Sequence, residues 1–315
     1  MEKKTINKII KILGNVVMII AIVFIVRRLL KYNIDYSILV KGNNLLIFKA
    51  LVFAYAISVI LCSIPWKNAV YLMTGEKLRF VDVAAVSTKA NVLKYIPGNI
   101  FQYIGRNALA VKNGLKHADV ALSTLIDVVI NLGTVFILTL VFAYDTVKDW
   151  ILQRVRVQYV VLFLIIITVI VIFVVVALYK KRDKYKDTLK RVFSKNGIGI
   201  ILLNILLYIA LSLYTTVIYI IAMSVILGGS FDVNRLYYVA GAVLASWMLG
   251  FITPGAPGGM GIRETVLLML LGGIMKEEVI LLSVVVNRVI SILGDVLALA
   301  VMQVVVKVWR TQNNE

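Results

Sequence analysis

The sequence has a single cysteine and a single histidine, and this scarcity excludes several kinds of chemistry. With Cys62 alone, no disulfide can form within the chain. With His117 alone, there is no Cys/His cluster for zinc and no catalytic Ser/His or Cys/His arrangement with spare members. The GxxxxGK[ST] motif that cradles nucleotide phosphates is also missing. We therefore expect neither a metal nor any other cofactor.

Acidic residues are scarce as well, and the polar fraction is low. The chain has 34 basic and 16 acidic residues, a formal net charge of +18, which in a soluble protein would suggest nucleic acid as the partner. However, 61% of its 315 residues are hydrophobic and the mean hydropathy is +0.94. Soluble domains are nearer half apolar, so lipid must cover part of this surface. We expect membrane phospholipids as partners, basic loops that face an anionic leaflet, and no nucleic acid.

Six apolar runs are long enough to cross a membrane core, which takes about 20 helical residues. They cover residues 9–26, 44–64, 120–144, 157–179, 198–227 and 278–306. Their β-branched residues do not indicate strands, because the runs lack the period-two alternation of a membrane barrel. The sequence predicts an all-α integral membrane protein, with residues 1–315 forming one polytopic domain in the cell membrane.

Two further apolar segments are interrupted by proline and glycine. Residues 81–112 contain KYIPGN, Lys94 to Asn99, and residues 236–274 contain TPGAPGGMGIRE, Thr253 to Glu264. The pieces beside each break are about 12–18 residues long, short for a crossing but suited to half-helices that meet at a turn. We predict two re-entrant segments. The alternative is that all eight segments span the membrane and that the breaks are kinks.

The basic residues predict an orientation, and the breaks predict a repeat. Lys180 to Lys195 contains eight basic and two acidic residues, so it is assigned to the cytoplasm, and six spans then place both termini inside. The two interrupted segments would enter from opposite faces. Pro97 and Pro257 lie 160 residues apart. This spacing favours an inverted repeat, whose binding site would lie near the bilayer midplane between the broken helices.

The second break offers an anion site. Its helix-breaking residues are Pro254, Gly255, Pro257, Gly258, Gly259 and Gly261. Arg263 and Glu264 follow at the start of a new helix, where free N–H groups attract anions and a guanidinium adds two donors. We interpret this break as a phosphate-binding turn. The alternative is a structural loop in which Arg263 and Glu264 neutralise each other.

The first break supplies further donors from both of its half-helices. Pro97 and Gly98 form the turn, and the candidate substrate-binding residues are Lys94, Asn99, Gln102 and Arg106. Lys94 could instead extend to the cytoplasmic surface. The aromatic residues read as interfacial anchors are Tyr95, Tyr103, Trp66, Trp150 and Trp309.

Charged residues inside the spans are few. Asp127 and Arg288 lie 161 residues apart, at equivalent places in the proposed repeat, and a twofold axis would bring them close together. Asp295 lies on the last span. Asn131 and Asn287 could extend a polar network. One interpretation is an ion pair that holds the halves together, and the other is a proton-linked or substrate-linked switch.

At these residues the chain resembles a known family. KYIPGN with the following Gly105 and Arg106, then PGAPGGMGIRE, then NRVISILGD in the last span resemble the flippase-like membrane region of lysylphosphatidylglycerol synthases. The resemblance implies a multi-pass fold with re-entrant helices that moves an anionic or aminoacylated phospholipid. Members often carry an acid–arginine pair in the third span, whereas here Val128 follows Asp127. Because the chain ends at Glu315, we expect the soluble lysyltransferase domain of bifunctional members to be absent.

The leading hypothesis is a lipid transporter for a phospholipid or a lipid-linked glycan, without catalytic residues. One alternative is a membrane-embedded lipid-modifying transferase, for which Asp127, Glu264 and Asp295 would be the available acids. The other is an accessory subunit of phosphatidylglycerol lysyltransferase. The chain could act as a homo-oligomer or beside a separate lipid-modifying enzyme.

Overall fold

The computed structural model describes residues 42–95, 100–112, 114–142, 165, 182–226, 233–253, 257–259 and 261–312. Within these ranges the chain is helical and contains no strand. Four helices there are long and apolar enough to cross a membrane, which bears out the expected all-α integral membrane class. The predicted spans 9–26 and 157–179 lie outside the described residues.

The four long helices correspond to predicted spans. They are α2 (Asn44–Leu61) continuing into α3 (Ser63–Thr74), α6 (His117–Phe142), α10 (Lys195–Ile221) with the π-helix η3 (Ala222–Ile226), and α13 (Glu277–Gln312). The first of them continues well past the predicted end at residue 64. Pro65 does not stop it, because this proline lies in the first turn of α3, where no backbone donor is needed.

The first interrupted segment is a hairpin of two short helices. It consists of α4 (Phe80–Asn91), the 3₁₀ turn η2 (Val92–Tyr95) and α5 (Phe101–Lys112). The two α-helices pack against each other. Each has 12 residues, a length of about 18 Å against a membrane core of about 30 Å.

The second interrupted segment is also a hairpin, but its arms are unequal. It consists of α11 (Val233–Ile252), the 3₁₀ turn η4 (Pro257–Gly259) and α12 (Ile262–Leu271), and α11 packs against α12. The 10 residues of α12 are short, whereas the 20 residues of α11 exceed the predicted arm length. Pro97, Gly98, Asn99 and Pro254 lie outside the described residues.

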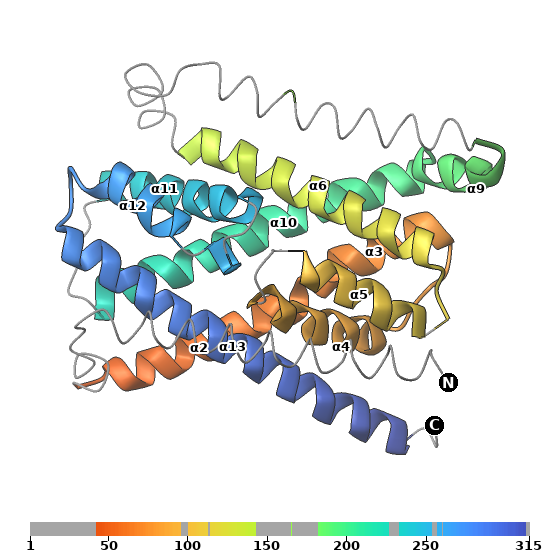
Figure 1. Ribbon diagram of the computed structural model, residues 1–315, viewed down its shortest axis with the longest axis horizontal. Helices are drawn as coiled ribbons and strands as arrows, with labels where there is room; N and C mark the ends of the chain where they lie inside the picture. Colours follow the sequence, from red (N-terminus) through yellow and green to blue (C-terminus); the bar gives the residue numbers. More distant parts are fainter. Residues whose placement is uncertain are drawn as a thin grey trace, which may run out of the picture.

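The two hairpins meet inside the molecule, where η2 contacts η4. Each long helix that follows one hairpin packs against the first arm of the other hairpin. Thus α6, after the first hairpin, packs on α11, and α13, after the second, packs on α4. The long helices run along the long axis (Figure 1). The start of α2 and the α12–α13 connection lie at one end, and α9 (Arg182–Val192) and the C-terminal end of α13 lie at the other.

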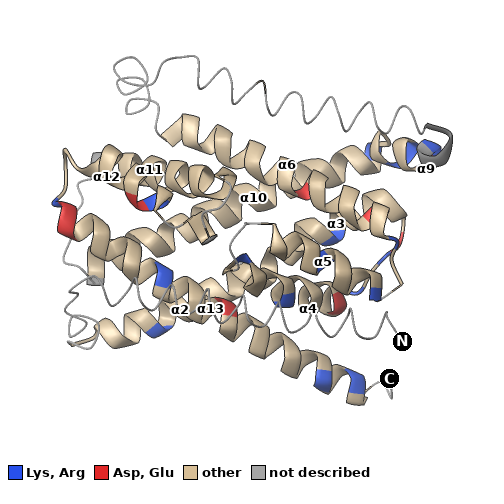
Figure 2. Cartoon of the chain, in the orientation of Figure 1, with Lys and Arg blue, Asp and Glu red and all other residues tan. Residues whose placement is uncertain are grey.

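Basic residues gather at the end that contains α9, as Figure 2 shows for α9 and for the last turns of α13. The helix α9 is joined to α3 by side chains that satisfy the last carbonyl groups of that helix. Thr188 Oγ1 donates to the Met73 carbonyl at 3.1 Å, and Arg191 Nη1 donates to the Leu72 carbonyl at 3.1 Å. A basic residue in this position also complements the negative end of the α3 dipole.

Trp66 is not the interfacial anchor that the sequence suggested. Its side chain is only 1% exposed and packs with Val70, Val83 and Val120 in the core beneath the first hairpin. The prediction was wrong because α3 continues past Pro65, which moves Trp66 from the end of a span to its interior.

Candidate functional site

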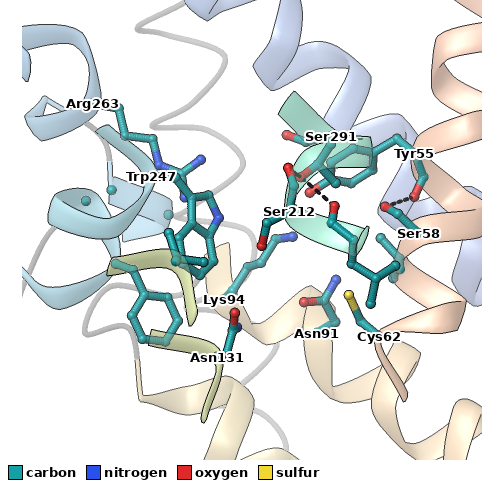
Figure 3. A pocket seen from close by; sticks show the side chains of 18 of the residues that line it. Tyr55, Ser58, Cys62, Asn91, Lys94, Asn131, Ser212, Trp247, Arg263 and Ser291 are labelled. Atoms are coloured by element: carbon teal, nitrogen blue, oxygen red, sulfur yellow. Dashed lines mark hydrogen bonds between the residues drawn. The ribbon is translucent and has the colours of Figure 1, made fainter. Parts of the chain in front are cut away.

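A cavity of about 280 Å³ lies between the two hairpins. It is lined by residues of both hairpins and of α2, α6, α10 and α13, some of which are drawn in Figure 3. Its basic lining residues are Lys94, Arg106, Arg263 and Arg288. The cavity lies where the two broken segments meet, and its chemistry depends on how these four cations are paired.

Lys94 pairs with Asp295 across the interface between the first hairpin and α13. The Lys94 Nζ lies 2.7 Å from the Asp295 Oδ2, and that carboxylate is fully buried. Asn91 donates to the other carboxylate oxygen at 2.7 Å, and the Tyr95 hydroxyl donates to Oδ2. Lys94 therefore points into the protein instead of extending to the cytoplasmic surface, and Tyr95 is an internal hydrogen-bond donor instead of an interfacial anchor.

Arg106 of α5 pairs with Asp127 of α6, the long helix that follows α5 in the chain. Arg106 Nη1 lies 3.1 Å from Asp127 Oδ2, and the Tyr208 hydroxyl of α10 donates to the other carboxylate oxygen. The guanidinium carbon lies 4.9 Å from the centre of the Trp66 ring, within cation–π range. Asp127 thus has an arginine partner from the preceding half-helix, although Val128 follows it in sequence.

Glu264 pairs with Arg288 and not with its neighbour Arg263. Arg288 Nη2 lies 2.8 Å from Glu264 Oε1, and the backbone N–H of Gly261 donates to Glu264 Oε2 at 2.8 Å. The alternative in which Arg263 and Glu264 neutralise each other is therefore wrong. Glu264 instead closes the glycine turn and ties α12 to α13.

Asp127 and Arg288 both line the cavity, but the ion pair between them that one interpretation of the sequence predicted does not form. Each residue pairs within its own half, with Arg106 and Glu264 respectively. Each hairpin is joined by one ion pair from its second arm to the long helix that follows. In the first pair the hairpin arm supplies the base and the long helix the acid, and in the second pair these roles are reversed. The spacing of Asp127 and Arg288 in the sequence did not reveal their partners, because each pairs with the hairpin arm that precedes its own helix.

Arg263 is different from the other three cations. Its Nε, like that of Arg106, is buried without a hydrogen-bond partner among the described residues, but only Arg263 of the four forms no ion pair with a described carboxylate. The side chain passes over two glycines. A Cβ on Gly250 would lie 2.7 Å from Arg263 Cγ, and one on Gly259 would lie 2.9 Å from Arg263 Nε. The missing side chains make room for this guanidinium.

The charges around the cavity leave an excess of one cation. Lys94, Arg106 and Arg288 are matched by Asp295, Asp127 and Glu264 in the described part of the chain. Arg263 has no such match there and lines the cavity (Figure 3). A partly buried guanidinium without an anionic partner is costly in free energy.

Other predicted residues divide into two groups. Those that line the cavity are Gln102, Gly258, Gly259 and Asn287. Gly261 and Glu264 are not among its lining residues. They hold the turn instead: Gly261 has a φ of +86°, which favours glycine, and precedes the first residue of α12. Pro257 starts the turn η4.

Several lining residues were not predicted from the sequence, notably Tyr55, Tyr208 and Trp247. Tyr208 lies in the middle of a predicted span, where an isolated hydroxyl needs a polar partner. That signal was available. Tyr55, in the middle of the predicted span 44–64, carries the same signal, whereas Trp247 carries none, because aromatic residues are common on lipid-facing surfaces as well.

The fold and the cavity define a polytopic α-helical membrane protein with a central polar site built from two broken segments. Residues 11–298 match the family described as Lysylphosphatidylglycerol synthase TM region. The chain therefore belongs to this family, as the motifs around both breaks indicated. No curated protein matches the chain.

Proposed function

We propose that this chain is a lipid transporter that moves an anionic or aminoacylated phospholipid, or a lipid-linked glycan, between membrane leaflets. The observation that carries the proposal is Arg263, the cavity cation with no acidic partner among the described residues. Membership of a family named for a lipid-modifying synthase supports a lipid as the ligand.

Arg263 has the properties of a phosphate ligand. Its guanidinium presents two parallel donors, which match two oxygens of a phosphate, and charge-assisted bonds of this kind are strongest away from water. Gly250 and Gly259 place it against bare backbone instead of side chains. The cavity of about 280 Å³ is at the small end of ligand pockets, so it would hold the headgroup while the acyl chains stay in the bilayer.

The arrangement of the halves supports an inverted repeat with six spans and two re-entrant hairpins. The packing of α6 on α11 mirrors that of α13 on α4, and the two hairpin turns meet at the centre. The ion pairs Arg106–Asp127 and Glu264–Arg288 occupy equivalent positions. Transporters built this way move one repeat against the other around a site near the midplane. The basic end with α9 would face the cytoplasm, and both termini would lie there.

The alternative of a membrane-embedded transferase receives less support. Such an enzyme needs a free general base or nucleophile at the cavity. The three carboxylates closest to the cavity cations, Asp127, Glu264 and Asp295, are each engaged by a cation at 3.1 Å or less, so none of them is a free general base. The accessory-subunit alternative predicts no lipid movement by the purified chain alone, so a translocation assay distinguishes it from a transporter.

The test is lipid translocation by the purified full chain in liposomes that contain traces of fluorescent lipids. Wild-type protein should move an anionic phospholipid. Arg263→Ala should slow this movement about 10- to 100-fold, the value of one lost charge-assisted contact. The translocation rate of Arg263→Lys should lie between those of the wild type and Arg263→Ala, because lysine keeps the charge but lacks the two parallel N–H donors of the guanidinium. Arg310→Ala, an exposed arginine at the end of α13, is the matched control.

Melting temperatures of the same preparations separate function from folding. Slow translocation by a variant that melts like the wild type supports the phosphate site. Full transport by well-folded Arg263→Ala would remove it. No movement of any lipid by the wild-type protein would contradict the transporter itself.

A further inference from the structure

Two carboxamides face the cavity without partners. Asn131 on α6 and Asn287 on α13 both line it, and neither forms a hydrogen bond to another described residue. Other buried amides of the chain are engaged: Asn91 donates to Asp295 at 2.7 Å, and Asn68 donates to Asn204 at 2.8 Å. The two cavity amides are therefore available to a ligand.

The chemistry of these amides suits hydroxyl groups. Each carboxamide offers two donors and a carbonyl acceptor, and a hydroxyl group both donates and accepts. Trp247 lines the same cavity and stacks on Phe251, with ring centres 5.2 Å apart and planes inclined by 20°. This stack presents a flat apolar surface, and Figure 3 shows Trp247, Arg263, Lys94 and Asn131 around one open space.

The same cavity is poorly suited to an amine. Among the described residues, Asp127 and Asp295 are already neutralised by Arg106 and Lys94, so no carboxylate is left for an ammonium group. The faces of two nearby tyrosines are also occupied, because the Lys94 ammonium lies 5.3 Å from the Tyr95 ring centre and 5.9 Å from that of Tyr55. An ammonium ion would lose its hydration and find no unpaired carboxylate among the described residues to compensate for that loss.

We infer that the cavity binds a phosphodiester headgroup that ends in a small uncharged polyol, such as glycerol or a sugar, in preference to one that ends in an amine. Arg263 holds the phosphate, and Asn131 and Asn287 hold the hydroxyl groups. The inference rests on the proposed lipid transport and narrows its substrate class: aminoacylated and ethanolamine lipids become poor substrates.

The test compares lipids that differ only in the headgroup. Liposomes of phosphatidylcholine with the reconstituted full chain would contain traces of phosphatidylglycerol or phosphatidylethanolamine, each labelled on the acyl chain. The glycerol headgroup should move about tenfold faster, the equivalent of one or two hydrogen bonds. Asn131→Leu with Asn287→Leu should abolish this preference and keep the melting temperature, and Asn107→Ala, outside the cavity, should change nothing.

Two further measurements complete the test. Asn131→Asp adds a carboxylate and should shift the preference toward the amine headgroup. Soluble glycerophosphoglycerol should compete with the lipid if the headgroup alone is recognised, and a lack of competition would show that the acyl chains are needed for binding. Equal transport of both lipids by the wild type, with no effect of the Asn131 and Asn287 changes, would overturn the inference and leave the transporter intact. No transport of any lipid would instead contradict the proposed function.

Discussion

At the scale of single residues, two glycines decide where the unpaired arginine lies. Gly250 on α11 and Gly259 in the turn η4 approach so closely that a Cβ on Gly259 would lie 2.9 Å from Gly250 Cα. The Arg263 side chain crosses this bare backbone. Gly259 also has a φ of +72°, a conformation that other residues rarely adopt. The cavity cation therefore depends on residues that carry no chemistry of their own.

Gly250→Ala should lower stability by about 1–3 kcal/mol through overpacking, and it should slow lipid translocation by displacing the guanidinium. Alanine is intrinsically better than glycine in a helix by about 1 kcal/mol, so any loss of stability must come from the contacts of the added Cβ with Arg263 and the Gly259 backbone. Melting temperature and translocation would be measured on the same sample. Gly133→Ala on α6 is the control, because nothing lies within 4 Å of its added Cβ. Identical behaviour of the two variants would refute the proposed contact.

At the scale of elements, each hairpin is joined to the long helix that follows it. Arg106 of α5 pairs with Asp127 of α6, and Glu264 of α12 pairs with Arg288 of α13. These ion pairs fix the second arm of each hairpin to the long helix that follows it. A pair of this kind is sensitive to the loss of one partner, because the other charge then stays partly buried and unmatched.

Glu264→Gln and Arg288→Gln should each destabilise the protein by about 3 kcal/mol, whereas the double variant should lose clearly less than the sum. Thermal unfolding in detergent would give the three values. Asp82→Asn provides the comparison: it breaks the exposed Arg79–Asp82 pair on α4 and should cost at most about 1 kcal/mol. Strictly additive losses for Glu264 and Arg288 would show that the pair does not couple α12 to α13.

At the scale of the whole molecule, the long helices begin and end near its two opposite sides (Figure 1). The start of α6 lies with α9 at the basic end, and the α12–α13 connection lies at the other end. This grouping follows from helices that run along one axis, and it implies that the two hairpins open toward opposite sides. A membrane normal parallel to that axis accounts for both the charge distribution and the lengths of the long helices.

Single cysteines at Lys116, Lys186 and Lys276 test this topology in a Cys62→Ser background, which is needed because Cys62 lines the cavity. The three lysines are exposed. An impermeant thiol reagent added to right-side-out cells should label only position 276. After permeabilisation all three positions should react. Ser194 is a poorer choice, since its hydroxyl caps α10 by accepting from the Gly197 N–H. Labelling of positions 116 and 276 from the same side would contradict the inverted repeat.

The sequence by itself determined the features that depend on local composition. Runs of apolar residues predicted the four described long helices, since about 20 such residues are needed wherever a helix crosses lipid. Proline and glycine predicted both breaks, because neither residue can continue a helix without cost. The motifs around these breaks also identified the family. The extension of α3 to Thr74 was missed, because a proline in a first turn looks in sequence like a helix end.

Only the tertiary structure decided which charges are neutralised. Lys94 pairs with Asp295 although about two-thirds of the chain separates them in sequence, and among the described residues Arg263 has no acidic partner although an acid is the next residue. Composition shows how many charges a membrane protein holds, but an ion pair needs two atoms within about 4 Å. That distance is set by how the helices pack against one another, so the sequence identified the break that forms this site while the fold decided which arginine is free to bind.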